Sequence, residues 1–116
     1  MLMPMILKPE DVADIQARYH YLVNYESDDP TAPIDPATYV DSNGDHLLHI
    51  AAHLGDLKTV EMLVEAGQDV DQTGDMGCTA LHYAKRGKRV DVERYLLACG
   101  ARTDISNDFG KLPGEM

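Results

Sequence analysis

Gly44-Asp-His-Leu-Leu-His-Ile-Ala-Ala-His-Leu-Gly55 is matched, thirty-three residues later in the chain, by Gly77-Cys-Thr-Ala-Leu-His-Tyr-Ala-Lys-Arg-Gly-Lys88. The same offset relates Leu63 to Leu96. Self-similarity at a fixed period of this length is typical of solenoids built from stacked repeats. Each unit contains a short apolar helix, a turn, a second apolar helix and a loop. The sequence therefore predicts an all-α solenoid of helix-turn-helix-loop units.

The repeated unit resembles the ankyrin repeat, whose pattern is Gly-x-Thr-Pro-Leu-His-x-Ala-Ala-x-x-Gly, followed by an apolar helix that ends Leu-Leu-x-x-Gly-Ala. The positions that keep this pattern are, in the second unit, Gly77, Thr79, Leu81, His82, Ala84, Leu96, Leu97, Gly100 and Ala101, and in the first unit, Gly44, Leu48, His49, Ala51, Ala52, Gly55 and Gly67. The departures are His46 in place of Thr, Leu47 and Ala80 in place of Pro, and Lys88 where the first unit has Gly55. The resemblance implies a stack that binds proteins and carries no catalytic residues, so we expect a non-enzyme.

We expect a single domain with five parts in chain order: a cap helix over 8–25, an acidic proline-rich loop over 26–38, a first repeat over 39–71, a second repeat over 72–104 and a truncated third repeat over 105–116. The cap helix does not match the repeat, and terminal units of solenoids are usually altered into caps. Its apolar stripe comprises Val12, Ile15, Tyr19, Leu22 and Val23. Its three tyrosines, at 19, 21 and 25, cannot all lie on that stripe, so at least one is expected to be exposed. The loop that follows is either a linker or a functional segment.

Acidic residues dominate the first two thirds of the chain. The net charge is -10 over 116 residues, of which 44% are apolar and 26% charged, as in globular proteins. Residues 1–80 hold fifteen acidic and three basic residues, a net charge of -12, whereas residues 81–116 hold five and seven, a net charge of +2. Such a surface repels nucleic acid and anionic lipid and attracts basic proteins. The alternative is that the charge serves only solubility.

The chain carries no pattern typical of secretion or membrane insertion. The apolar segment 1–7 is short, has no basic residue before it and is followed by an acidic helix, so we expect no signal peptide. No stretch approaches the roughly 18 apolar residues of a membrane span. Cys78, expected on a loop tip, and Cys99, expected at the end of an outer helix, are too few for a disulfide framework. We therefore expect a cytoplasmic protein with reduced thiols.

Three histidines, His46, His49 and His53, follow one another at helical spacing, and a pair four residues apart can bind zinc. No cysteine or acid is placed to complete such a site, and His49 matches His82, which in the family bonds loop backbone. We expect structural histidines, no metal and no cofactor, with a metal-dependent enzyme or sensor as the alternative. The stretch 41–45 resembles the start of a calcium loop, but His46 and Ala52 occupy the positions that require Gly and Glu.

The basic cluster 85–89 falls at the end of an inner helix, where the helix dipole favours cations. It could instead bind an anion or pair with an acidic surface. We find no catalytic residue set.

The resemblance implies that the loop tips and the exposed side of the inner helices form a concave surface. The residues expected to bind a partner there are Ser42, Asn43, Asp45, His53, Leu54, Asp75, Met76, Cys78, Arg86, Asp108, Phe109 and Lys111. Met76 and Phe109 stand out, because apolar residues ringed by acids are typical of an interface centre. Phe109 could alternatively fold back over the last repeat.

From these features we expect a protein that acts by binding another protein, and neither nucleic acid, nor a membrane, nor a small-molecule substrate. The more specific hypothesis is a bacterial immunity protein, an acidic inhibitor that neutralises a basic toxin such as a nuclease. The alternative is a scaffold or regulatory subunit that bridges cellular proteins through two separate surfaces.

Overall fold

The computed structural model describes residues 7–115, and its helices stack in two layers. In chain order the elements are α1 (Pro9–Arg18), α2 (Leu47–Leu54), α3 (Leu57–Glu65), η1 (Asp75–Gly77), α4 (Ala80–Arg86), α5 (Val90–Ala98) and η2 (Pro113–Glu115). Within the described part of the chain there is no β-strand, and a single isolated bridge joins Val40 to His46. The predicted all-α solenoid is confirmed. Residues 1–6, which make up most of the segment considered as a signal peptide, lie outside the described range.

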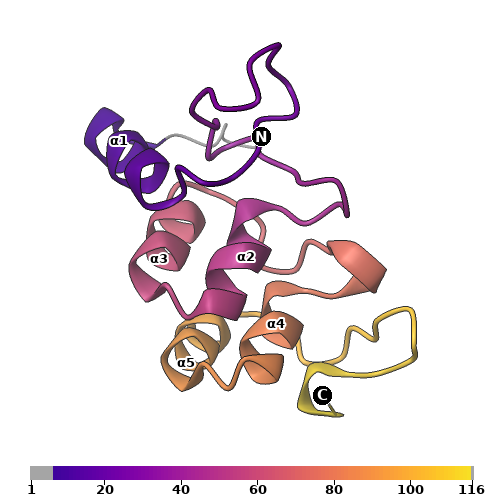
Figure 1. The fold of residues 1–116 in the computed structure, drawn as a ribbon. Coiled ribbons are helices and arrows are strands. Elements are labelled where there is room, and N and C mark those ends of the chain that lie inside the picture. The colour runs from indigo at the N-terminus through magenta and orange to yellow at the C-terminus, as the bar shows by residue number, and fades with distance from the viewer. Residues whose placement is uncertain (1–6, 116) are drawn as a thin grey trace, which may run out of the picture.

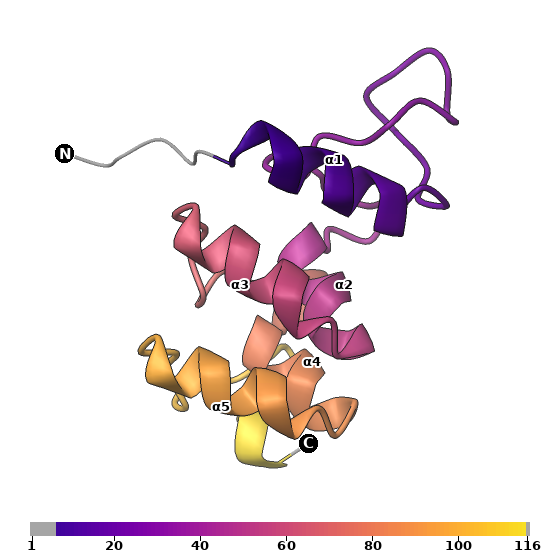
Figure 2. The same ribbon diagram turned by 90° about the vertical axis from the view of Figure 1, so that its left-hand side faces the viewer.

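The inner layer contains α2 and α4, which pack on each other, and the outer layer contains α1, α3 and α5 (Figure 1, Figure 2). Equivalent positions of the two repeats fill the core: Leu63 and Leu96 are fully buried, as are Ala51 and Ala84. The alanines allow neighbouring helices to approach closely, and the leucines fill the space between the layers. None of the helices in the described residues is long and apolar enough to cross a membrane.

The inner helices begin with different capping arrangements. In α4, the Thr79 hydroxyl accepts a hydrogen bond from the His82 amide (3.4 Å), and the Thr79 amide donates to His82 Nδ1 (3.0 Å). In α2, only the second of these bonds is present, from the His46 amide to His49 Nδ1 (2.9 Å). The His46 side chain does not cap the helix, and its Nδ1 is buried without a partner. The cap at His46 is therefore weaker than the cap at Thr79.

The two signature histidines join successive loops. His49 Nε2 lies 3.0 Å from the Gln72 carbonyl oxygen, and His82 Nε2 lies 3.0 Å from the Lys111 carbonyl oxygen. Because Nδ1 of each ring accepts an amide proton, Nε2 carries the ring proton and donates it to the carbonyl. Burial lowers the pKa of His49, which favours this neutral form. The predicted structural role of these histidines is confirmed.

The cap helix is shorter than the predicted span of 8–25, because the chain leaves the helical conformation at Tyr19 (φ -109°, ψ 29°). This departure brings the Tyr19 hydroxyl to Asp56 Oδ2 (2.8 Å), while Arg18 Nη1 donates to Asp56 Oδ1 (2.8 Å). Asp56 is the N-cap of α3, whereas Leu7 and Lys8 lie near the other end of α3. Helix α1 therefore runs antiparallel to α3 (Figure 2).

This direction explains the long connection from α1 to α2. Helices α3 and α5 end nine positions before Gly74 and Asn107, where the chain enters the next repeat, but twenty-three positions separate the end of α1 from the equivalent Asp41. Because α1 ends on the opposite side, the chain must cross the top of the stack above α2 (Figure 1). The crossing buries Ile34, whose carbonyl accepts a hydrogen bond from Gln16 Nε2 (2.9 Å). The N-terminal cap thus consists of α1 together with this connection.

The last described residues follow the repeat pattern into a third unit. Asn107 Oδ1 accepts hydrogen bonds from the amides of Phe109 (2.9 Å) and Lys111 (3.0 Å), which shapes the loop. The Leu112 amide donates to Glu115 Oε1 (2.7 Å). This bond is equivalent to the one from the Thr79 amide to His82 Nδ1 in the second repeat. The turn η2 packs on α4 as the first turn of a third inner helix.

Candidate protein-binding surface

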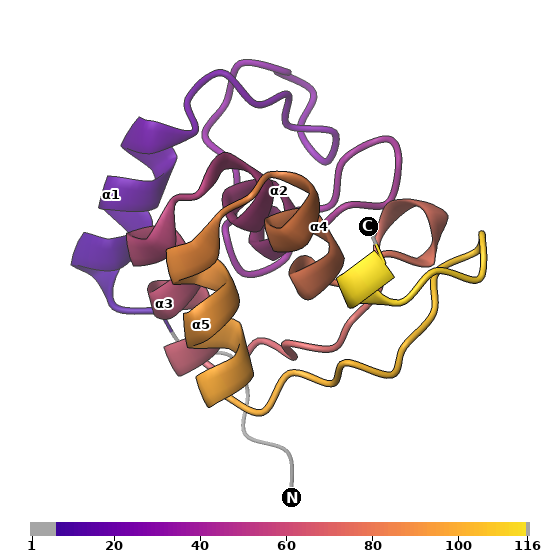
Figure 3. The same ribbon diagram turned by 90° about the horizontal axis from the view of Figure 1, so that it is seen from below.

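Three loop tips, formed by residues 41–45, 74–78 and 107–111, lie in a row on the side of the inner helices away from the outer layer (Figure 3). We call them tips 1, 2 and 3. Asp45 Oδ1 of tip 1 accepts a hydrogen bond from the Asp75 amide of tip 2 (2.9 Å). The Met76 carbonyl of tip 2 accepts one from the Asp108 amide of tip 3 (2.9 Å). These bonds hold the row in a fixed order before any partner binds.

Tyr83 of α4 connects tip 1 to exposed residues of the inner helices α2 and α4. Its hydroxyl donates to Asp45 Oδ1 (2.7 Å), and its ring lies 6.0 Å from the ring of His53 and 5.5 Å from Arg86 Cζ. Burial raises the pKa of Tyr83, and the hydrogen bond to Asp45 raises it further, so the hydroxyl keeps its proton. The sequence prediction missed Tyr83. The available signal was an aromatic residue at the variable position after the signature histidine, where α2 has Ile50.

The structure leaves most of the predicted partner-binding residues accessible. The exposed ones are Ser42, Asn43, His53, Leu54, Met76, Arg86, Asp108, Phe109 and Lys111, and Asp45 and Asp75 are half-buried. Cys78 was expected at an exposed tip, and this is wrong. Its side chain is 1% exposed and accepts a hydrogen bond from Asn107 Nδ2 (3.6 Å), because it points into the stack between tips 2 and 3.

Met76 and Phe109 occupy equivalent positions on neighbouring tips and are 50% and 66% exposed. The alternative in which Phe109 folds back over the last repeat is therefore wrong. Met76 also has a positive φ of 56°, which a residue with a side chain rarely adopts. Two large apolar side chains thus project from a hydrogen-bonded row next to Asp75 and Asp108.

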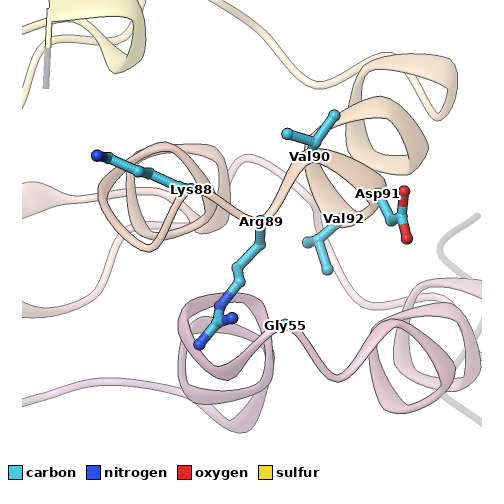
Figure 4. A pocket seen from close by; sticks show the side chains of 6 residues that line it. All are labelled: Gly55, Lys88, Arg89, Val90, Asp91 and Val92. Carbon is cyan, nitrogen blue, oxygen red and sulfur yellow. The ribbon is translucent and has the colours of Figure 1, made fainter.

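The opposite end of the inner helices is basic, as the cluster 85–89 predicts. A surface pocket of about 280 Å³ lies there, lined by Gly55, Lys88, Arg89, Val90, Asp91 and Val92 (Figure 4). The Arg89 side chain extends over Gly55, and its Nε donates to the His53 carbonyl at the end of α2 (3.1 Å). The surface of the inner helices therefore runs from acidic and apolar tips to a basic end.

His49 is not available as a metal ligand. Both ring nitrogens of His49 are engaged with backbone groups, as described above, so this residue has no lone pair free for a metal. Within the described range, no group of three or more His, Cys, Asp and Glu side chains is arranged to hold an ion. The alternative of a metal-dependent enzyme or sensor built on His46, His49 and His53 loses its geometric basis.

Comparison with known families agrees with this architecture. The family described as "Ankyrin repeats (3 copies)" matches residues 18–107, which is most of the chain. The chain belongs to the ankyrin-repeat family. This family is in general one of non-enzymatic protein-interaction modules, so the chain is a protein-binding module and the expectation of a non-enzyme agrees with it.

Three relatives that the chain resembles are proteins of eukaryotes. It is 41% identical over 69 residues to human "Protein phosphatase 1 regulatory subunit 27" (60% of this chain, 45% of the relative). It is 39% identical over 70 residues to mouse "Ankyrin repeat domain-containing protein 40" (60% and 19%). It is 32% identical over 114 residues to Arabidopsis thaliana "ADP-ribosylation factor GTPase-activating protein AGD4" (89% and 14%). The chain spans less than half the length of each, and none of the three supports a bacterial immunity protein.

Proposed function

We propose that this ankyrin-repeat chain is a regulatory or scaffold subunit that binds a partner protein through the row of tips and the adjoining inner helices. The observation that carries the proposal is the pair of exposed side chains, Met76 and Phe109, on tips that are hydrogen-bonded to each other. Preformed surfaces lose less conformational entropy on binding, and apolar anchors surrounded by polar residues are typical of binding hot spots. Asp75 and Asp108 beside them favour a partner with basic residues around an apolar centre.

The relatives support this role over an inhibitory one. One relative, 41% identical over 69 residues, is named as a regulatory subunit of protein phosphatase 1. The catalytic subunit of protein phosphatase 1 is therefore the first purified partner to test, by calorimetric titration. Cytoplasmic location remains a prediction.

The inhibitor of a basic toxin remains a second candidate, supported by charge alone. Residues 1–80 carry a net charge of -12, and acidic inhibitors attract basic nucleases electrostatically. The two roles differ in their effect on the partner. An inhibitor abolishes the activity of its partner at equimolar amounts and loses affinity steeply with salt, whereas a regulatory subunit leaves a catalytically active complex.

Affinity capture with tip variants tests the proposed surface. Tagged wild-type protein and a Met76→Ser, Phe109→Ser variant are used to capture partners from the native cell at low and high salt. Val90→Ser is the matched control, because Val90 is 51% exposed but lies on α5, away from the tips. We expect the partner to be lost with the tip variant and kept with the control. A partner retained equally by both variants would place the interface elsewhere and reject the proposal.

A further inference from the structure

The connection that crosses the top of the stack carries an exposed aromatic patch that the tips do not use. Tyr21 and Tyr25 are 58% and 55% exposed. Burial raises the pKa of the neighbouring Tyr39, and negative charge on Asp41, and on Tyr25 and Tyr21 once they ionise, raises it further. The Tyr21 ring is also 6.1 Å from the Tyr19 ring. We call Tyr21 and Tyr25 the tyrosine patch.

Tyr25 lies in a loop whose two ends are joined by hydrogen bonds. The Asn24 amide donates to the Pro30 carbonyl (3.0 Å), and Asn24 Nδ2 donates to the Pro33 carbonyl (2.9 Å). The two ends of the loop 24–33 therefore lie next to each other. Inside the loop, Asp29 Oδ1 accepts hydrogen bonds from the Thr31 amide (2.9 Å) and hydroxyl (2.7 Å). Compact loops closed in this way are frequently functional.

The surroundings of the tyrosine patch are acidic and lack compensating charge. Residues 19–40 contain Glu26, Asp28, Asp29 and Asp35 and no lysine or arginine. The acids that form ion pairs in the described residues are Asp14, Asp56, Glu93 and Asp104. The four acids of residues 19–40 are not among them. Residues 19–40 thus combine four carboxylates with two exposed aromatic rings. This combination is complementary to guanidinium groups, which pair with carboxylates and stack on aromatic faces better than ammonium groups do.

We propose that the tyrosine patch and the acids of the 24–33 loop bind an arginine-containing basic segment of a partner protein. This interface lies at the α1 end of the stack, whereas Met76 and Phe109 lie on tips 2 and 3 towards the other end (Figure 1). The chain thus offers two separate surfaces, and the second does not depend on the function proposed for the tips.

A titration followed by amide chemical shifts tests this interface with a defined probe, a short peptide of alternating arginine and glycine. We expect saturable shifts of the amides in residues 19–40 and weaker binding of the matched lysine–glycine peptide. Tyr21→Ala with Tyr25→Ala removes two cation–π contacts and is expected to lower the affinity roughly tenfold. Val90→Ala, an exposed apolar truncation on α5, is the matched control and leaves the affinity unchanged.

A second variant tests the same interface in case the tyrosine variant does not fold. Glu26→Gln with Asp28→Asn changes two exposed side chains without altering their size, and it is expected to weaken binding of the arginine peptide. The proposal is overturned if the shifts spread over the acidic tips instead of residues 19–40, or if the lysine peptide binds as tightly as the arginine peptide. It is also overturned if the tyrosine variant, shown to be folded by its spectrum, binds the arginine peptide as the wild type does.

Discussion

Replacement of Asp56 by alanine is expected to detach the N-terminal cap from the repeats. Asp56 accepts hydrogen bonds from the Thr59 amide (3.3 Å) and hydroxyl (2.6 Å) within α3, and from Tyr19 and Arg18 of the cap. Burial by itself would raise the pKa of Asp56, but the hydrogen bonds from Thr59 and Tyr19 and the charge of Arg18 outweigh it and lower the pKa. The carboxylate is therefore the ionised link between α1 and α3.

The expected cost follows from these contacts. Loss of the N-cap costs about 1 kcal/mol. Loss of the partly buried bond to Tyr19 costs about 1 kcal/mol. The Arg18 side chain of the ion pair is 37% exposed, so the pair contributes about 0.5 kcal/mol after solvent screening. Asp56→Ala is thus expected to lower the free energy of unfolding by about 2.5 kcal/mol, or the melting temperature by roughly 10 °C.

Chemical denaturation and amide hydrogen exchange measure this effect. Asp56→Asn keeps a good N-cap and is expected to cost about 1 kcal/mol less than the alanine variant. A double-mutant cycle with Tyr19→Phe should give a coupling energy of about 1 kcal/mol. Exchange should accelerate in α1 more than in α5, because solenoid units depend on their neighbours. The control Lys58→Ala removes an exposed side chain at the start of α3 and should change stability by less than about 0.5 kcal/mol.

Asp56 does not link the cap to the repeats if Asp56→Ala costs less than about 0.5 kcal/mol, or if the coupling with Tyr19 is indistinguishable from zero. Either result would mean that apolar contacts alone, such as those of the fully buried Ile15, hold the cap on the stack.

Three further predictions concern the repeats. Gly74→Ala would place a Cβ 2.4 Å from Asp45 Oδ1, so it should displace this carboxylate from tip 2 and lower the free energy of unfolding by about 2 kcal/mol, measured in urea; an unchanged midpoint would contradict the close packing. Lys88 has a φ of 56° where Gly55 has 77°, so Lys88→Gly should raise the melting temperature by a few degrees while Lys88→Ala does not, and equal effects would refute strain at this position. The pKa of His49 lies below its ordinary value of 6.5, so below that pH the unfolded chain takes up a proton that the folded chain does not, and stability should fall as the pH drops. His49→Gln should flatten this dependence in unfolding curves across the same pH range, and an unaltered slope would show that other groups cause it.

Much of the fold could be predicted from the sequence, because short-range sequence patterns determine the structure of each repeat. The offset between His49 and His82, and the apolar residues on each helix, determine where the inner and outer helices lie and which side of each is buried. The weaker cap at His46 and the exposure of Met76 also follow from residue type and position in the repeat, whereas the sequence left open whether Phe109 is exposed or folds back over the last repeat. Each unit contacts only its neighbours, so short-range patterns suffice for these features.

The direction of α1, the polar link at Asp56 and the role of Tyr83 were decided only by tertiary structure. The hydrogen bond from Tyr19 to Asp56 spans 37 residues, and the one from Tyr83 to Asp45 spans 38. Neither pair follows the repeat offset. The sequence marks Tyr83 only as an aromatic residue at a variable position of the repeat, and it does not indicate that Asp45 is its partner. The cap lies outside the periodic part of the chain, so its path depends on which partners its side chains find on the first repeat. Cys78 is buried for a related reason, because only the packing of tip 3 on tip 2 covers it.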